Sequence, residues 1–215
     1  MFELCASILA ADFAHLSRDV QTAEAAGVDA FHIDIMDGHF VPAISFGTGM
    51  VRTMRSLTHK PLDVHLMVDR PQDFVAELAA LGAERVSVHA EVPGGPGGAL
   101  AAIRAAGMQA GLVLNPETPL ETATPYLPQI GQLLLMTVQP GRGGQPYLPG
   151  SNARIAAAKT LLQTAPHPVI IQVDGGITAR TLPGAYQAGA GSVVSGSAVF
   201  AGPIAFNVRA LRYAI

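Results

Sequence analysis

The stretch AAGVDAFHI, residues 25–33, joins the end of a predicted helix to a predicted buried strand through a single glycine. The same junction recurs as ALGAERVSV at 80–88 and as QAGAGSVVS at 187–195. Glycine commonly ends a helix because it adopts the left-handed backbone conformation without steric cost. This repetition predicts βα units of about 25 residues in one continuous fold and argues against separate domains.

Eight short apolar runs are spaced fairly evenly, and their Val, Ile and Leu content is typical of parallel strands covered on both faces. The runs cover residues 4–9, 30–36, 62–68, 85–91, 109–114, 132–138, 169–175 and 192–199. Segments with helical spacing lie between them, at 12–26, 72–81, 98–106, 152–165 and 178–188. The pattern predicts an α/β fold, a single (β/α)8 TIM barrel with eight parallel strands, as one domain over residues 1–215.

An open doubly wound sheet is the alternative, but it usually has fewer strands and a glycine-rich first turn. Here the first turn reads ILAADF, residues 8–13, and is not glycine-rich. The segment 115–131 carries four prolines, which permit only short helix because proline lacks a backbone N–H.

Composition narrows the function classes before any motif is considered. The net charge is −3 over 215 residues, so the chain has no basic field for binding nucleic acid. The single cysteine, Cys5, excludes an internal disulfide and fits a reducing compartment. No signal-peptide layout and no apolar run of about 18 residues occurs, so we expect a cytoplasmic protein that does not enter a membrane.

Polar side chains interrupt three of the predicted strands, and in a barrel the active site lies at the strands' carboxyl ends. His32 and Asp34 are spaced by two residues in the second run and therefore face the same way. His65 lies in the third run and Asp174 ends the seventh, so all four converge at one mouth if they point inward. Two imidazoles and two carboxylates suit one divalent metal ion, Zn²⁺, Fe²⁺, Mn²⁺ or Co²⁺.

Each of these residues also has a plainer interpretation, since a lone strand histidine is more often a hydrogen-bonded core residue than a ligand. Considered together, the four favour a metal, because burying two unpaired carboxylates would cost many kcal/mol. Asp63 is interpreted as an acid that opens its strand, in preference to a residue that supports a ligand. His89 is interpreted as a hydrogen-bonded structural histidine, although it ends the fourth strand near the mouth.

Three methionines, Met36, Met67 and Met136, lie near the same end of three predicted strands. Ordinary core filling explains them, and the functional alternative is a soft, dry wall around a metal-bound anion. Beyond the second strand, we expect Asp37 and His39 to cap the loop and to take no part in catalysis.

Glycines cluster after the last three predicted strands, as QPGRGGQ at 139–145, DGGI at 174–177 and SGSAVF at 195–200. Glycines at such positions allow backbone N–H groups to approach phosphate oxygens, and these loops are the recurrent phosphate site of barrels. One glycine pair alone could form a tight turn, but three clusters at neighbouring strand ends predict phosphate binding.

At these residues the chain resembles the ribulose-phosphate 3-epimerase family. The matching motifs run nearly end to end in the family's order: SILAADFAHL, HIDIMDGHFVP, PLDVHLMV, VHAE, GLVLNPETPLE, PGRGGQ, VDGGI and GSAVF. The resemblance implies a (β/α)8 barrel that binds one divalent metal ion through His32, Asp34, His65 and Asp174. It also implies that no organic cofactor is needed and that the chain forms a homo-oligomer.

The resemblance further implies an isomerase of the pentose phosphate pathway that interconverts D-ribulose 5-phosphate and D-xylulose 5-phosphate. Asp34 and Asp174 would work as the acid/base pair on opposite faces of C3, with the metal stabilising the cis-enediolate through the C2 and C3 oxygens. Met36, Met67 and Met136 would shield that enediolate. The implied contacts to the small phosphorylated ketose are Ser7, His65, Gly141, Arg142, Gly143, Gly144, Asp174, Gly175, Gly176, Gly196 and Ser197.

Three positions depart from the family pattern. Ala43 follows HFVP where asparagine is common, Arg142 stands where members usually carry an aromatic residue, and Gln139 stands where many members carry asparagine. The alternative substrate is therefore another ketose phosphate, such as D-allulose 6-phosphate.

Two further functions belong to other classes. A Schiff-base aldolase would need a lysine at a strand end, and the only lysines are Lys60, before the third run, and Lys159, in a helical segment. A barrel that merely binds a sugar phosphate is the alternative without catalysis, and the presence of both histidines and both acids argues against it.

Overall fold

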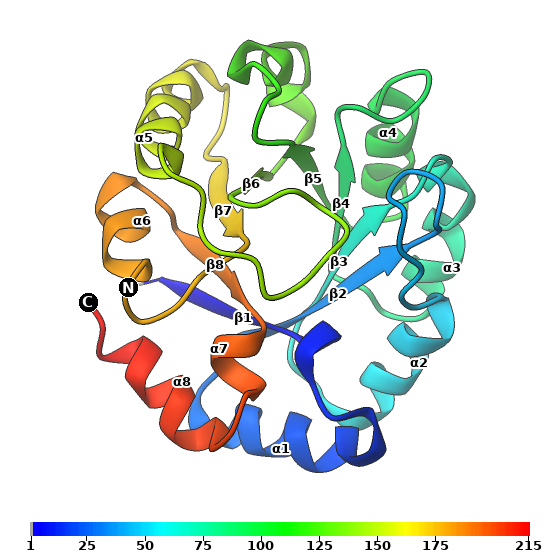
Figure 1. Ribbon diagram of the computed structural model, residues 1–215. Coiled ribbons are helices and arrows are strands. Elements are labelled where there is room, and N and C mark those ends of the chain that lie inside the picture. Colours follow the sequence, from blue (N-terminus) through cyan, green and yellow to red (C-terminus); the bar gives the residue numbers. More distant parts are fainter. Residues whose placement is uncertain (1) are drawn as a thin grey trace.

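Eight parallel strands close into one barrel in chain order, with the helices arranged around its outside (Figure 1). The computed structural model describes residues 2–215. The strands are β1 Glu3–Ser7, β2 Ala30–Met36, β3 Leu62–Met67, β4 Arg85–His89, β5 Gln109–Leu114, β6 Gln132–Met136, β7 Ile170–Asp174 and β8 Ser192–Ser195. The predicted (β/α)8 TIM barrel is confirmed, and the open doubly wound sheet is excluded.

The α-helices are α1 Leu16–Ala26, α2 Thr48–Leu57, α3 Val75–Ala80, α4 Gly97–Ala105, α5 Ser151–Leu161, α6 Leu182–Ala188, α7 Ser197–Phe200 and α8 Ile204–Arg212. Short 3-10 helices supplement them: η1 Ile8–Ala10, η2 Phe13–His15, η3 Pro71–Asp73, η4 Leu120–Gln129 and η5 Leu162–Thr164. The eighth run was predicted to continue to residue 199, but β8 ends at Ser195 and α7 follows at once.

The segment after β5 forms only short helix, as its prolines predict. The connection to β6 carries only η4, which contains Pro125 and Pro128 and therefore lacks two of the N–H groups that an α-helix needs. Two α-helices, α7 and α8, follow β8.

The glycine junctions end helices as the sequence predicts. Gly27 follows α1 with φ of 107°, and its N–H bonds to the carbonyl oxygens of Ala23 and Glu24. Gly189 ends α6 in the same way, with φ of 124°. The left-handed conformation turns the chain back toward the next strand, which sets the start of β2 and of β8.

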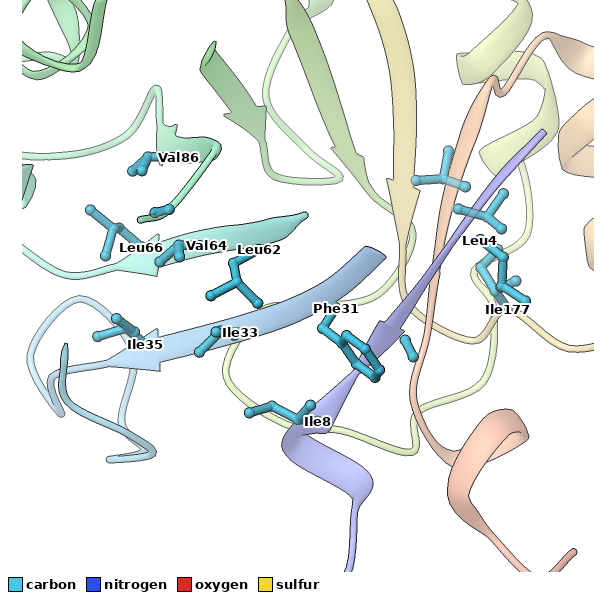
Figure 2. Close-up of a cluster of buried hydrophobic side chains, with 14 of the residues drawn as sticks. Leu4, Ile8, Phe31, Ile33, Ile35, Leu62, Val64, Leu66, Val86 and Ile177 are labelled. Carbon is cyan, nitrogen blue, oxygen red and sulfur yellow. The ribbon is translucent and has the colours of Figure 1, made fainter. Parts of the chain in front are cut away.

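Alternating side chains divide the strands into two faces. The outward face carries large apolar residues that pack beneath the helices; Figure 2 labels several of them, including Phe31, Ile33, Val64 and Leu66. The inward face of β2 and β3 holds paired residues, because His32 lies opposite Asp63 and Asp34 opposite His65 in the register. One period-two pattern therefore supplies both the core and the candidate site.

Polar side chains fill the barrel interior beneath the mouth. Gln132 Nε2 donates to Gln172 Oε1 at 2.8 Å, and Gln172 Nε2 donates to Asp63 Oδ2 at 2.7 Å. Cys5 is buried among them on β1, as predicted, and burial raises the pKa of its thiol. Among residues 2–215, no helix combines the length and the apolar character needed to cross a bilayer.

Candidate active site

Four predicted ligands meet at the carboxyl ends of β2, β3 and β7. One ligand atom from each of His32, Asp34, His65 and Asp174 lies within 4.8 Å of the others. His32, Asp34 and His65 are buried, and Asp174 is partly open to the cavity above. This separation is short enough for one cation to contact all four side chains.

The two ring nitrogens of His32 have different surroundings. Its Nδ1 lies 3.0 Å from Asp63 Oδ2, whereas its buried Nε2 has no hydrogen-bond partner among the described residues. Because a carboxylate accepts, Nδ1–H is the donor in this contact, and Nε2 then directs a lone pair into the site. An orphaned buried nitrogen beside two carboxylates fits a divalent cation.

The contact to His32 corrects the interpretation of Asp63 as an acid that merely opens its strand. Asp63 is fully buried, and its Oδ1 lies 3.6 Å from Arg85 Nε. Burial would raise the pKa of Asp63, but the Arg85 charge and His32 hold it well below its usual range. Asp63 therefore stays ionised and supports His32 from the barrel interior.

Asp34 has three polar neighbours. Its Oδ2 accepts a hydrogen bond from Ser7 Oγ at 2.7 Å, and its Oδ1 lies 3.3 Å from His65 Nδ1 and 3.4 Å from His32 Nε2. Burial would raise the pKa of Asp34, but the two histidines lower it below its usual range. Ser7, predicted to contact substrate, thus has Asp34 as its partner in this structure.

The pKa of Asp174 is shifted in the opposite direction to that of Asp34. Burial and the negative charge of Asp34 raise the pKa of Asp174 to about 7. Two neighbouring carboxyl groups whose pKa values are driven apart can hold and accept a proton at the same pH. The arrangement therefore has the electrostatics of an acid/base pair.

His65 continues into a chain of polar groups that the sequence did not predict. Its Nε2 lies 2.8 Å from His89 Nε2, and His89 Nδ1 lies 3.1 Å from Glu91 Oε2. Burial lowers the pKa of His89 to about 4, and that of Glu91 is lowered to about 2 by hydrogen bonds that outweigh its burial. His89 is a buried, hydrogen-bonded histidine, as predicted.

A cavity of about 1210 Å³ lies above these groups. Met36, Met67 and Met136 line it together with Ser7, Asp34 and Asp174. His65 was predicted to contact substrate, but it is fully buried and does not line the cavity. The three methionines are buried and add apolar surface to the wall of the cavity.

The cavity rim contains every glycine predicted to bind phosphate, together with Arg142: Gly141, Gly143, Gly144, Gly175, Gly176 and Gly196, and beside them Ser197. Figure 1 shows the chain after β6 crossing the barrel opening before it reaches α5. Gly176 has φ of 66°, and a Cβ there would collide with the backbone N of Tyr147 in that crossing segment. The close backbone approach explains the need for glycine at this position.

Sequence reasoning missed Arg180, which lines the same rim from the loop after β7. Neither Arg142 nor Arg180 has an ion pair or a side-chain hydrogen bond among residues 2–215. The sequence could have predicted this position, because Arg180 lies four residues after DGG in a loop that follows a barrel strand. Two unpaired guanidinium groups leave the rim positively charged.

The remaining expectations concern the loop after β2 and the lysines. Asp37 Oδ1 accepts hydrogen bonds from the backbone N–H groups of His39 and Phe40, so loop capping is confirmed. Lys60 precedes β3 and Lys159 lies within α5, and neither lines the cavity. A Schiff-base mechanism therefore has no amine at this site.

The closed parallel barrel, the carboxylate–histidine cluster and the glycine-rich rim define a (β/α)8-barrel enzyme with a candidate metal centre at its mouth. The family model for the ribulose-phosphate 3 epimerase family matches residues 3–200. The chain belongs to this family and is therefore an isomerase of the epimerase type.

Curated relatives are similar over nearly the whole chain. The ribulose-phosphate 3-epimerase of Treponema pallidum (strain Nichols) is 41% identical over 94% of this chain and 93% of its own. That of Bacillus subtilis (strain 168) is 40% identical over 93% of each. Among solved structures, KGPDC from Streptococcus mutans has a TM-score of 0.74 at 14% identity, covering 100% of this chain and 97% of its own. That likeness shows the barrel fold alone.

Proposed function

We propose that the chain is a metal-dependent 3-epimerase that interconverts D-ribulose 5-phosphate and D-xylulose 5-phosphate. The observation that carries this proposal is the pair Asp34 and Asp174, two cavity-lining carboxyl groups with opposite pKa shifts in a member of the epimerase family. Inverting a carbon centre requires one group that removes a proton and another that delivers a proton to the opposite face.

The two carboxyl groups divide this work. Asp34, fixed by Ser7, and Asp174 both line the cavity, so one can accept the C3 proton while the other delivers one. The roles reverse when the other epimer is the substrate, by microscopic reversibility. Met36, Met67 and Met136 exclude water from the planar intermediate, which favours return of the proton from the enzyme.

The donor set fits one divalent cation, Zn²⁺, Fe²⁺, Mn²⁺ or Co²⁺. His32 Nε2, His65 Nδ1 and the carboxylates of Asp34 and Asp174 would hold it, and no organic cofactor is required. When bound, such a cation supplies the Lewis acidity that stabilises negative charge on an enediolate. Removing the metal with a chelator should abolish activity, and adding back one of these cations should restore it.

The test of the chemistry is incorporation of solvent deuterium at C3 of D-ribulose 5-phosphate, followed by NMR. Asp34→Asn and Asp174→Asn should each lower exchange at least about 10²-fold, the usual contribution of a positioned acid or base. Asp73→Asn, the same change on an exposed surface acid, is the matched control. Full exchange in either active-site variant would overturn the two-base assignment.

The phosphate group is assigned to the glycine rim of the cavity, which contains Gly141, Gly143 and Gly144 after β6 and Gly175, Gly176, Gly196 and Ser197 after β7 and β8. Backbone N–H groups and the unpaired Arg142 supply donors and positive charge for a dianion. Arg142→Gln should raise KM for the phosphorylated ketose about tenfold with little change in kcat, whereas the exposed surface variant Arg52→Gln should change neither.

A different ketose phosphate, such as D-allulose 6-phosphate, is the second candidate substrate. Ala43 and Arg142 both line the cavity and both depart from the family pattern, so they alter the part of the site that surrounds the sugar. Comparison of kcat/KM on the two substrates separates the candidates. A metal-loaded protein that binds either sugar phosphate without C3 exchange would instead indicate a binding protein.

The family resemblance also supports a single domain over residues 1–215, cytoplasmic residence and assembly into a homo-oligomer. Analytical ultracentrifugation of the purified chain tests the assembly, and a monomer at micromolar concentration would contradict it.

A further inference from the structure

His65 has a polar neighbour at each ring nitrogen. Nδ1 lies 3.3 Å from Asp34 Oδ1 and 3.9 Å from Asp174 Oδ2, and Nε2 lies 2.8 Å from His89 Nε2. The His65 and His89 ring planes are 22° apart, so an N–H can lie close to both planes. Two nitrogens at this distance need one proton between them, and the position of that proton on one ring determines the tautomer of the other.

The second nitrogen of His89 decides the direction of this hydrogen bond. Nδ1 of His89 lies 3.1 Å from Glu91 Oε2, and an ionised carboxylate can only accept. A neutral His89 therefore carries its proton on Nδ1 and presents a lone pair at Nε2. His65 must then donate from Nε2, and its Nδ1 carries a lone pair. Because ionised Asp34 can only accept, a cation held between Nδ1 and the carboxylates of Asp34 and Asp174 would satisfy all three groups.

Glu91 is itself held in place. Its Oε1 accepts hydrogen bonds from the backbone N–H of Asn115, at 2.9 Å, and from Thr118 Oγ1. Both donors belong to the chain that follows β5, so a segment distant in sequence fixes the carboxylate. With Oε1 occupied by two donors, Oε2 is the atom that remains for His89.

We propose that Glu91 and His89 are positioning residues that hold His65 in the Nε2–H tautomer, so that Nδ1 is the atom offered to the cation. The inference rests on the metal site proposed above. His32 is held in the opposite tautomer, because Asp63 accepts its Nδ1–H and leaves Nε2 for the metal. The two histidines of the centre thus bind through different nitrogens, and each is oriented by its own buried carboxylate.

The direct test is NMR of the protein labelled with ¹⁵N-histidine and loaded with zinc, a diamagnetic ion. The expected spectrum shows His65 metal-bound at Nδ1 and protonated at Nε2, with the reverse for His32. Zinc bound through His65 Nε2 would overturn the inference even if the enzyme were fully active. This measurement uses the unmodified chain and needs no variant to fold.

The variant Glu91→Gln tests whether the Glu91 carboxylate determines the tautomer of His65. Oε1 of the new amide must still face the Asn115 and Thr118 donors, so its NH₂ group must point at His89 Nδ1. That nitrogen then has to accept, His89 donates from Nε2, and the proton of His65 moves to Nδ1, where it opposes the metal. Zinc affinity, measured by competition with a chromophoric chelator, should fall about 10- to 100-fold.

Glu121→Gln is the matched control, because Glu121 is exposed on η4. Saturating zinc should restore C3 exchange in the Glu91→Gln variant, since Asp34 and Asp174 are intact. If the Glu91→Gln and Glu121→Gln variants bind zinc with equal affinity, the inference is overturned. Failure of the unmodified chain to bind zinc would overturn the metal site and this inference together. Zinc bound in the expected tautomers without C3 exchange would overturn only the proposed reaction.

Discussion

Ser7 Oγ donates a hydrogen bond to Asp34 Oδ2 at 2.7 Å, which ties the end of β1 to the inward face of β2. The two residues are 27 positions apart in the chain and meet only because β1 and β2 are neighbours in the barrel. The bond stabilises the ionised form of Asp34 and fixes which of its oxygens faces the two histidines.

Ser7→Ala should therefore weaken catalysis without removing a reacting group. Loss of a hydrogen bond to a charged acceptor costs about 1.5–3 kcal/mol, so kcat/KM should fall about 10- to 100-fold. Ser192→Ala, which alters another buried serine of the barrel interior that does not contact the carboxylates, is the control. Equal kcat/KM values for the two variants would mean that the hydroxyl does not act through Asp34.

The buried ion pair beneath the site should contribute strongly to stability. Asp63→Asn leaves the Arg85 charge with only Glu3, at 2.7 Å, and removes the charge that supports His32. Breaking a buried pair costs about 3–5 kcal/mol, whereas Asp73→Asn, which breaks an exposed pair with Arg70, should cost less than about 1 kcal/mol. Urea unfolding measures both, and similar losses would show that burial does not amplify the Asp63 interaction.

The glycine rim makes a prediction that separates backbone strain from steric conflict. Gly176 and Gly27 both have positive φ, so alanine should cost each about 1–2 kcal/mol of stability. Only at Gly176 would the new Cβ collide with the segment that crosses the barrel opening, because nothing lies within 4 Å of a Cβ at Gly27. Gly176→Ala should raise KM about tenfold or more, and Gly27→Ala should leave KM unchanged; equal KM values would remove Gly176 from the phosphate site.

His89 should make the metal-free protein less stable as the solution becomes acidic. Its pKa is about 4 in the folded chain and near 6.5 when exposed, so only the unfolded chain binds this proton between those values. The free energy of unfolding should therefore fall by up to about 1.4 kcal/mol per pH unit as the pH drops from 6.5 to 4. Urea titrations in a chelating buffer measure this slope, which His89→Gln should reduce; an unchanged slope would contradict the assignment.

Most of the fold was predictable from local patterns. The helix–glycine–strand junctions and the apolar runs located all eight strands within a few residues, because a buried parallel strand needs a continuous apolar segment. The segment before β6 was predicted as short helix from its prolines, and η4 confirms it. The helices α2 and α8 were missed, since their mixed composition becomes a helix only where one face packs on the barrel.

The part of the candidate site that depends on residues spaced by two along a strand was predictable from the sequence. His32 and Asp34 had to share one face of β2, and the barrel register then placed His65 beside Asp34. The spacing could not reveal that Asp63 supports His32, because the same alternation is compatible with an acid that only opens a strand.

The sequence by itself determined the residue types, their faces and the order of the strands, because side-chain alternation and glycine conformation are local properties of the chain. Only the tertiary structure decided which hydrogen-bond partners these side chains have. Closure of the barrel placed Asp63 beneath His32, and the loop after β5 placed Asn115 and Thr118 against Glu91. Hydrogen-bond direction and pKa depend on these distances between elements remote in sequence, which no local pattern encodes.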